Sequence, residues 1–328
     1  MINKPIYVVS LFNGMGTLRQ ALHNLNIPVA KYWSSEIKPY ANKLQQYHFP
    51  DVIQVGDIRK WREWDIDWAQ VDLIGSGSPC QDLSIAGKRA GLTGDNSKLF
   101  WIFVEILNHV QKLNPNVKFL QENVGSAPKE AVGLISKSLG VYPVLINSNL
   151  VTAQNRARYY WSNFRIKEVG FFYKYVDIPQ PADRKIYLKD IIESGEVDRQ
   201  KSPVILESQK NAEKSQESLI KRGLKGMRGL VLEKSNTLLE SDGRKCKCND
   251  PQVQSNLLKR KLVVGRQVPA YTIQDGLYRL YTQTELERLQ GFPDGYTSIL
   301  SYNQASSVLG DGWTLPVIEH LLKYYTKE

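Results

Sequence analysis

The sequence predicts an α/β fold, a mostly parallel sheet with helices on both faces, plus a smaller loop-rich domain. Up to about residue 178, short β-branched and aromatic runs alternate with helical patterns, as is typical of parallel sheets. The stretch 199–266 is polar and irregular and carries 16 Lys and Arg against 7 Asp and Glu. We therefore expect an α/β domain over 1–178, an inserted domain over 179–276, and a C-terminal segment over 277–328 that returns to the first domain.

The first half of the predicted sheet begins with a strand, a glycine turn and a helix. The run 6–12 is apolar, Asn13-Gly14-Met15-Gly16 follows it, and a helical pattern then places Leu18, Ala21, Leu22 and Leu25 on one face. Five further runs have strand character: 29–35, 52–55, 71–75, 117–121 and 141–150. Helical patterns lie between them at 40–47, 99–113 and 130–139.

Ordered patterns return after the insertion. Thr282 and Glu285 have the spacing of a capping box, which opens a helix that stops at Gly291. A second helix begins at 314–316. Because ordered segments lie on both sides of the basic stretch, we interpret that stretch as an insertion rather than a tail.

Composition narrows the class of protein. A chain of 328 residues with 42% hydrophobic residues can bury a large core, which argues against a disordered protein. The net charge of +10 favours an acidic partner such as nucleic acid. No apolar run approaches the ~20 residues that cross a bilayer, and three cysteines do not form a disulfide framework. We expect a soluble, cytoplasmic protein with free thiols.

The first candidate site is the turn that contains Phe12, Asn13, Gly14 and Gly16. Glycines after a first strand let a ligand approach the backbone, and Glu36 follows at the distance of an acid that binds ribose hydroxyls. The third glycine of a dinucleotide fingerprint is absent, so a nucleoside without a pyrophosphate fits better. Asp57, after the third strand, could meet an adenine amino group. A plain tight turn with a surface Glu is the alternative.

The second candidate is Cys80, in a loop of Gly, Ser and Pro directly after the strand at 71–75. This position lies at the edge where parallel strands end, which suits a nucleophile better than a core thiol. Lys88 and Arg89 follow and could stabilise a thiolate. Taken alone, a cysteine such as Cys80 is more often a structural or incidental thiol.

The third and fourth candidates are Glu122, which ends the strand at 117–121, and the pair Arg156 and Arg158. Glu122 would share the crevice with Cys80 and could donate a proton if burial raises its pKa, although a helix-capping carboxylate is the usual alternative. Alternate residues of an extended segment lie on one face, so both arginines could hold a phosphate or a carbonyl oxygen. A solvated basic strand is the other reading.

Five motifs in this order resemble the DNA cytosine-5 methyltransferase family. They are Phe12-Asn13-Gly14-Met15-Gly16, Ser78-Pro79-Cys80-Gln81, Gln121-Glu122-Asn123-Val124, Gln154-Asn155-Arg156-Ala157-Arg158 and Arg288-Leu289-Gln290-Gly291-Phe292-Pro293. The resemblance covers about residues 5–165 and 278–325, and Gly312-Trp313-Thr314-Leu315-Pro316 is similar to the animal de novo branch. The chain departs from the family at Asn13, where an acid is common, and at Asp311, where Asn is usual.

The resemblance implies a Rossmann-like sheet that binds S-adenosylmethionine and a definite catalytic set. Cys80 would add to carbon 6 of cytosine, Glu122 would stabilise ring nitrogen 3, and Arg158 with Arg156 would hold the carbonyl oxygen. The residues implied in cofactor binding are Phe12, Asn13, Gly14, Gly16, Glu36, Asp57, Ile58, Pro79 and Leu99.

The resemblance also implies a double-stranded DNA partner and a flipped target base. The inserted domain would be the target recognition domain, and the loop 84–96 would fill the gap left by the base. DNA contacts are expected from Gln81, Ser84, Lys88, Arg89, Arg228 and Arg244. A compact bacterial or phage enzyme of this kind acts as a monomer, and a cognate restriction endonuclease could accompany it.

Three alternatives stay open at this point. A tRNA cytosine-5 methyltransferase shares the catalytic motifs, but the Cys-Phe-Thr tripeptide of that branch is missing. A non-catalytic DNA-binding protein on the same scaffold would be expected to lose reacting groups, and a nicotinamide oxidoreductase fits the first turn alone. Cys246-Lys247-Cys248 resembles half a zinc site without a second pair, so no metal is expected.

Overall fold

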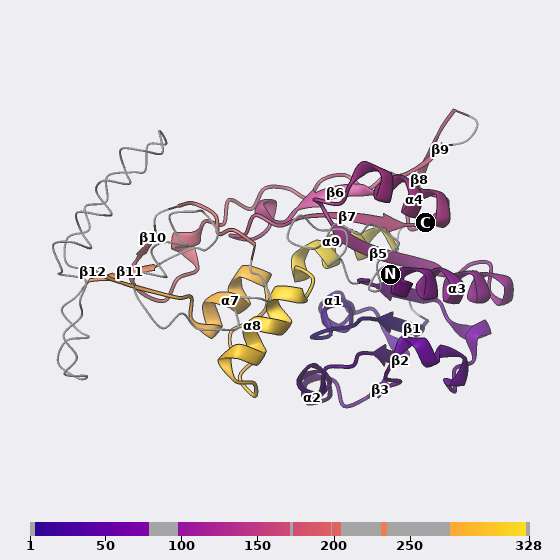
Figure 1. The fold of residues 1–328 in the computed structure, drawn as a ribbon, viewed down its shortest axis with the longest axis horizontal. Helices are drawn as coiled ribbons and strands as arrows, with labels where there is room; N and C mark the ends of the chain where they lie inside the picture. The colour runs from indigo at the N-terminus through magenta and orange to yellow at the C-terminus, as the bar shows by residue number, and fades with distance from the viewer. Residues whose placement is uncertain are drawn as a thin grey trace.

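The computed structural model describes residues 4–78, 98–170, 173–197, 199–204, 231–234 and 276–325. A seven-stranded sheet with the order β3-β2-β1-β4-β5-β7-β6 forms the centre of the fold (Figure 1). The predicted α/β fold class is therefore confirmed. Within the described ranges, no helix combines the length and apolarity needed to cross a bilayer.

The first four strands of the sheet run parallel to one another from the centre to one edge. They are β1 (Ile6–Leu11), β2 (Val29–Ser35), β3 (Val52–Gln54) and β4 (Leu73–Ser76). Every residue of β4 is buried, as are five of the six in β1. A strand buried on both sides needs cover on both faces of its sheet, which explains the run of apolar side chains instead of an alternating pattern.

The other half of the sheet contains one reversed strand. β5 (Lys118–Val124) runs parallel to β4, whereas β7 (Ala157–Ser162) lies antiparallel between β5 and β6 (Val144–Asn147). The predicted strand 141–150 is shorter than expected, because Ser148–Leu150 forms the 3-10 turn η4 with Asn147 as its N-cap. The segment Ala157–Ser162, treated from sequence only as extended, is this reversed strand.

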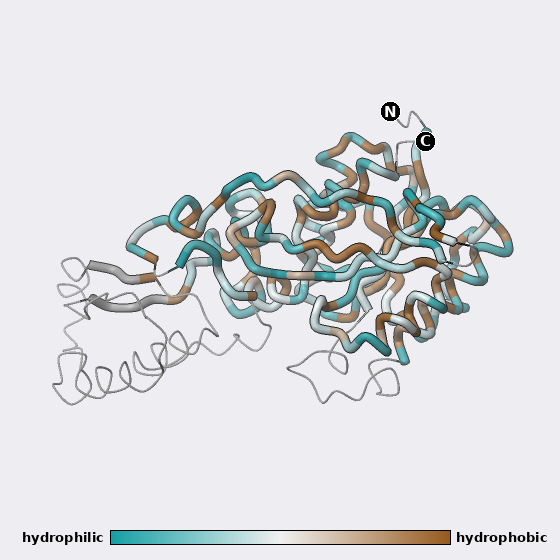
Figure 2. The backbone as a smooth tube through the Cα atoms, turned by 90° about the horizontal axis from the view of Figure 1, so that it is seen from above, coloured by the Kyte–Doolittle hydropathy of each residue, from teal (hydrophilic) through white to brown (hydrophobic). Residues whose placement is uncertain are grey.

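The predicted helices are present and pack on this sheet. They are α1 (Thr17–Asn24), α2 (Pro39–His48), α3 (Lys98–Leu113) and α4 (Lys129–Leu139). Two 3-10 segments, η1 (Ile58–Glu63) and η2 (Trp68–Gln70), pack against α3 and were not predicted. In Figure 2 hydrophobic and hydrophilic stretches alternate along the described chain, as expected for elements with one buried side.

Short strands follow the main sheet. β8 (Ile166–Val169) and β9 (Tyr173–Val176) form an antiparallel pair, and η5 (Leu188–Asp190) follows. β10 (Glu196–Val197), β11 (Val231–Lys234) and β12 (Gly276–Arg279) form a three-stranded sheet at the far end of the molecule from the termini (Figure 1). The expected boundaries at 179 and 277 stay predictions.

The C-terminal segment consists of three helices that return to the main sheet. α7 (Gln283–Gln290) begins with the predicted capping box, in which the hydroxyl of Thr282 and the carboxylate of Glu285 each accept the other's backbone N–H. α8 (Tyr302–Asp311) was not predicted, and α9 (Leu315–Tyr325) packs against α1. Two leucines of α9, Leu321 and Leu322, are fully buried.

Burial of α9 predicts that the C-terminal segment belongs to the core of the first domain. We expect Leu321→Ala to lower the free energy of unfolding by about 2–5 kcal/mol, because the substitution leaves a cavity in a closely packed interior. Urea denaturation measures this change. The matched control is Leu113→Ala, at a side chain that is 50% exposed, where we expect a loss below about 1 kcal/mol. Equal losses for the two variants would contradict the packing described here.

Candidate active site

The ends of four strands meet at one edge of the central sheet. Leu11 of β1 pairs with Ser35 of β2 and Ser76 of β4, and Ser76 pairs with Gln121 of β5. Because β7 runs in the opposite direction, its first residues lie at this same edge, where Arg158 pairs with Val124. Glu122 and Arg158, which were predicted from separate segments, are thereby brought together.

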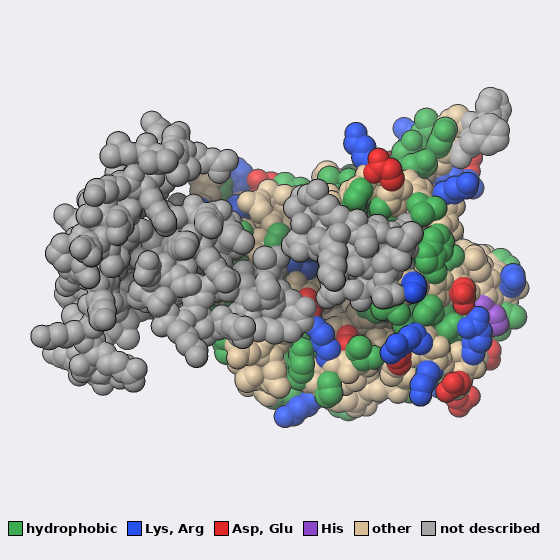
Figure 3. Space-filling view, in the orientation of Figure 1, with side chains coloured by type: hydrophobic (Ala, Val, Ile, Leu, Met, Phe, Trp, Pro, Cys, Tyr) green, Lys and Arg blue, Asp and Glu red, His purple; other side chains and the backbone are tan. Residues whose placement is uncertain are grey.

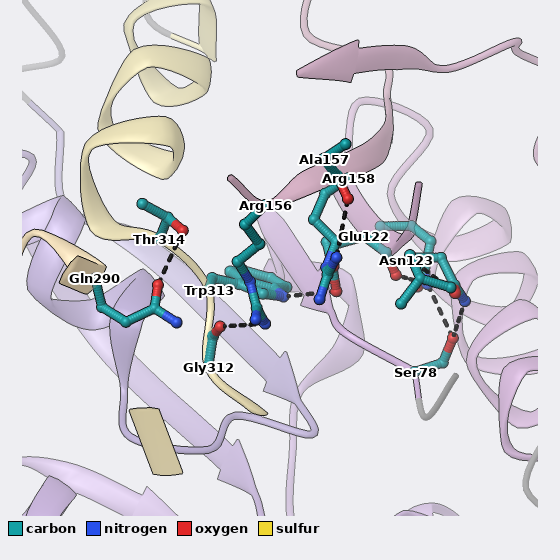
Figure 4. A network of polar contacts seen from close by, with 12 residues as sticks. Ser78, Glu122, Asn123, Arg156, Ala157, Arg158, Gln290, Gly312, Trp313 and Thr314 are labelled. Carbon is teal, nitrogen blue, oxygen red and sulfur yellow. Dashed lines mark hydrogen bonds and ion pairs between the residues drawn. The ribbon is translucent and has the colours of Figure 1, made fainter. Parts of the chain in front are cut away.

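Glu122 and Arg158 form an ion pair at this edge. The Nε atom of Arg158 lies 2.9 Å from Oε1 of Glu122, and the two side chains are 13% and 11% exposed. The other carboxylate oxygen, Oε2, accepts a hydrogen bond of 3.1 Å from the indole Nε1 of Trp313 (Figure 4). Arg158 also donates from Nη1 to the carbonyl of Ala157. Each carboxylate oxygen of Glu122 therefore has one donor.

Arg156 lies deeper than Arg158. Its side chain is 4% exposed, and Nη2 donates to the carbonyl of Gly312 at 2.9 Å. Burial, followed by repulsion from Arg158, lowers the pKa of Arg156 to about 10. Among the residues that the structure describes, Nη1 of Arg156 has no hydrogen-bond partner. A buried cation with an unused donor is suited to hold a further acceptor.

Trp313 is the site residue for which sequence reasoning gave no role. It stands in the C-terminal segment, 191 residues after its partner Glu122, so no local pattern links the two. The available sequence signal is the motif Gly312-Trp313-Thr314-Leu315-Pro316, whose similarity to one branch of the family does not indicate a partner for the indole.

The turn after β1 has an unusual backbone. Gly14 and Gly16 have φ of 56° and 84°, and Phe12, which is not a glycine, has φ of 55°. A positive φ is uncommon for a residue with a side chain and indicates a constrained turn. A Cβ added at Gly14 would meet no atom within 4 Å, so open space lies beside this backbone.

Glu36 fixes this turn from the end of β2. Its Oε2 accepts the N–H of Gly14 at 2.8 Å, while Oε1 accepts the N–H groups of Ile37 and Lys38, both at 2.8 Å. Ile37 itself is 69% exposed. The predicted acid is therefore held at the turn, next to an apolar side chain that faces solvent.

Asn13 points inward, into a buried polar network below the turn. Its Nδ2 donates to Ser34 and Gln45, and its Oδ1 accepts the hydroxyls of Ser10 and Tyr32. These four bonds use the full capacity of the amide. Burial raises the pKa of Tyr32 far above its usual value, so its hydroxyl stays a donor. The side chain of Asn13 therefore has no donor or acceptor left for a ligand.

Gln45 of α2 is the centre of this network. Its Oε1 accepts from Asn13, Ser34 and Gln54, and its Nε2 donates to the carbonyl of Gly14 at 2.6 Å. The side chain is 1% exposed. The position of the turn is thus set by a residue that sequence reasoning did not single out.

The remaining described cofactor candidates are Asp57, Ile58 and Leu99. Asp57 caps η1 by accepting the N–H of Arg59, and the hydrogen bond from the Arg59 guanidinium holds the pKa of this carboxyl below its usual range. Ile58 is buried, at 3% exposure, and Leu99 is half-buried in the first turn of α3.

Several predicted site residues lie outside the described residues. They are Cys80 and Pro79, together with the predicted DNA contacts Gln81, Ser84, Lys88, Arg89, Arg228 and Arg244. Cys246 and Cys248 also lie outside. Within the ranges that the structure describes, no group of three or more His, Cys, Asp or Glu side chains is arranged to hold a metal ion.

Comparisons with known proteins give a consistent result. The family model described as C-5 cytosine-specific DNA methylase matches residues 6–327. The chain is 28% identical to type II methyltransferase M.HpaII of Haemophilus parainfluenzae, over 95% of this chain and 86% of that protein. It is 26% identical to type II methyltransferase M1.ScrFI of Lactococcus lactis subsp. cremoris, over 95% and 75%.

Solved structures with the same fold include two methyltransferases. The Entamoeba histolytica methyltransferase EhMeth has a TM-score of 0.63 and 16% identity, and the comparison covers 98% of both chains. Spodoptera frugiperda DNMT2 has a TM-score of 0.59 and 17% identity, over 98% of this chain and 100% of the other. At such identities the likeness concerns the fold.

The network around Gln45 predicts a link between stability and cofactor binding. We expect Gln45→Met to lower the free energy of unfolding by about 2 kcal/mol or more, because buried donors of Asn13, Ser34 and Gln54 lose their acceptor. The affinity for S-adenosylmethionine should fall as well, since the turn at Gly14 loses its support. Urea denaturation and calorimetric titration measure the two effects.

The matched control is Gln20→Met, where the amide makes a single surface hydrogen bond to Asn24. We expect this variant to stay within about 0.5 kcal/mol of the parent protein and to bind the cofactor normally. If Gln45→Met behaved like Gln20→Met in both measurements, the network would not support the turn.

Proposed function

This chain belongs to the C-5 cytosine-specific DNA methylase family and is a DNA cytosine-5 methyltransferase, and we propose that Cys80 performs the reaction through a covalent bond to a cytosine flipped out of duplex DNA. The observation that most directly supports the proposal is the Glu122–Arg158 pair at the sheet edge. Ser78, two residues before Cys80, accepts a hydrogen bond from Gln121 beside that pair.

The proposed chemistry begins with the low reactivity of cytosine. Carbon 5 is too electron-poor to attack a methyl donor, so the Cys80 thiolate first adds to carbon 6. The electron pair of the carbon 5–carbon 6 double bond then moves toward carbon 4, and charge builds up on ring nitrogen 3, which takes a proton from the Glu122 carboxyl group. Arg158, with Arg156 behind it, holds the carbonyl oxygen at ring position 2. Carbon 5 is thereby made nucleophilic.

The second half of the proposed reaction restores the ring. The family and its fold imply S-adenosylmethionine, whose sulfonium would supply the methyl group that carbon 5 takes up and would leave as S-adenosylhomocysteine. A base removes the proton from carbon 5, the electron pair reforms the double bond, and the bond between carbon 6 and Cys80 breaks with its electron pair on sulfur. The proton on ring nitrogen 3 returns to Glu122. Methylated DNA and the free thiolate remain.

The residues at the turn fit this cofactor. Open space lies beside Gly14, Glu36 is held against the turn by three backbone N–H groups, and exposed Ile37 offers an apolar surface to a ring. We propose that Glu36 holds the ribose hydroxyls and that Ile37 covers the adenine, with the backbone of Phe12, Gly14 and Gly16 below. Asp57, Ile58, Leu99 and Pro79 would complete the pocket.

DNA is the substrate of this enzyme class, and the basic insertion is the part we propose to recognise its sequence. The charge supports this, because 199–266 accounts for 16 − 7 = +9 of the net +10 of the chain. On the face that Figure 3 shows, the basic and acidic side chains of the described residues are mixed. We therefore assign phosphate and base contacts to the insertion, which includes Arg228 and Arg244. We assign further DNA contacts to the segment that follows β4, at Gln81, Ser84, Lys88 and Arg89.

The remaining aspects of the biology are proposals of the same kind. We propose a monomer that acts in the cytoplasm on DNA, with a restriction endonuclease of matching specificity as its companion. The names of the relatives, which are type II methyltransferases, support the last point.

The substrate is tested directly by incubating the purified protein with radiolabelled S-adenosylmethionine and either unmethylated duplex DNA or tRNA. We expect label in DNA alone, since the sequence lacks the Cys-Phe-Thr tripeptide of the tRNA branch. Bisulfite sequencing of the product then gives the target word. Label in tRNA alone would overturn the proposal in favour of the tRNA enzyme, and no label in either would favour a non-catalytic protein.

The covalent step is tested with duplex DNA that contains 5-fluorocytosine. Fluorine cannot leave carbon 5 as a proton does, so the adduct should persist and intact mass spectrometry should detect one molecule of DNA bound at Cys80. Cys80→Ser should form no adduct and lose at least about 1,000-fold in methyl transfer, while its cofactor affinity is retained. The control is Cys246→Ser, which should form the adduct normally. Retained turnover in Cys80→Ser would contradict the nucleophile assignment.

A further inference from the structure

The indole of Trp313 lies between two parts of the proposed active site. Its Nε1 donates to Oε2 of Glu122 at 3.1 Å, as Figure 4 shows. On the side of β4, a Cβ added at Gly77 would come within 2.7 Å of the same Nε1 and 3.2 Å of the neighbouring ring carbon Cε2. The indole therefore packs directly on the backbone at Gly77, and the absence of a side chain there lets the N–H reach Glu122.

The backbone that carries Trp313 is itself fixed. The carbonyl of Gly312 accepts Nη2 of the buried Arg156. A Cβ at Gly312 would lie 2.3 Å from Cε of Met15 and 2.8 Å from the carbonyl oxygen of Val308, so the chain is in tight contact on that side. Anchored by these contacts, the indole has a defined position relative to β5.

The hydrogen bond from Trp313 matters because a second donor restricts the rotation of the Glu122 carboxylate. The terminal torsion of a Glu side chain is broad, and one ion pair leaves it room to turn. With Arg158 Nε on Oε1 and Trp313 Nε1 on Oε2, the plane of the carboxylate is fixed by one donor per oxygen. Arg156, Tyr160 and Asp311 are the other charged or titratable groups around this cluster, and none of them donates to Oε2 within the described residues.

We propose that Trp313 is a positioning residue of the methyltransferase, whose indole N–H holds the Glu122 carboxyl group in the orientation that presents a proton to ring nitrogen 3 of the target cytosine. The inference rests on the proposed function of Glu122 and deepens it, because it assigns half of the support of that carboxylate to the C-terminal segment. If Trp313 only packed over the site, its ring would be required but its N–H would not.

The test is Trp313→Phe, which keeps an aromatic ring and removes the N–H. We expect kcat for methyl transfer to fall about tenfold, as for the loss of a hydrogen bond to a charged group, while KM for DNA and for S-adenosylmethionine stays within about twofold. The matched control is Trp64→Phe, because Nε1 of Trp64 is buried and has no hydrogen-bond partner among the described residues. That variant should keep the parent kcat.

A second variant separates the donor from the shape of the side chain. In Trp313→His the Nε2–H can donate from about the same distance along the side chain, so kcat should recover above that of Trp313→Phe. If Trp313→Phe keeps the parent kcat, or if Trp313→His is no better than Trp313→Phe, the positioning role is overturned.

A double-mutant cycle with Glu122→Gln distinguishes failure of this inference from failure of the proposed function. We expect Trp313→Phe to cost about tenfold in the parent protein and less than twofold when Glu122 is already replaced, since the two residues act as a unit. An equal cost in both backgrounds would overturn the inference and leave Glu122 in its role. A parent kcat in Glu122→Gln alone would overturn the assignment of Glu122, and the inference with it.

Discussion

The reversal of β7 beside β5 is the constraint on which the active site depends. In a parallel sheet only the carboxyl ends of strands reach the edge where ligands bind. Because β7 is antiparallel, its first residues reach that edge as well, and Arg158 arrives next to Glu122. Gly125 permits the close approach, since a Cβ there would lie 2.7 Å from the carbonyl oxygen of Ala157. A parallel strand would place Arg158 at the opposite edge.

The C-terminal segment completes what the sheet begins. Tyr296 donates its hydroxyl to the carbonyl of Met15 within the turn after β1, and its ring stacks on His48 of α2 with centroids 4.0 Å apart. Gly312 receives Arg156, and Trp313 reaches Glu122. The buried ion pair at the edge would be costly without such additional partners, because desolvation of two charges offsets much of their attraction. The C-terminal segment thus contributes contacts to the site and does not only pack over it.

Local patterns predicted much of the fold and part of the site. Strands β1 to β5 and helices α1 to α4 followed from runs and periodicities that a single segment contains. The direction of β7 did not, because a six-residue run with three aromatic side chains in its middle has strand character in either direction, and only pairing decides it. Helix α8 was missed because Ala, Ser and Gly give Tyr302–Asp311 a weak apolar face, although Ser301 and Gln304 form a capping box. The roles of Gln45 and Trp313 depend on partners far away in the chain.

The two departures from the family pattern, Asn13 and Asp311, can each be explained by the contacts around the turn after β1. Asn13 must donate to Oε1 of Gln45 while Gln45 donates to the carbonyl of Gly14. A carboxylate at position 13 could not donate, so Gln45 would have to turn its amide round and release Gly14. The amide at position 13 and Gln45 therefore require each other.

At the second departure, the carboxylate of Asp311 lies 2.6 Å from Nζ of Lys38. The negative charge that Asp introduces in place of Asn is thus paired with a cation two residues after Glu36.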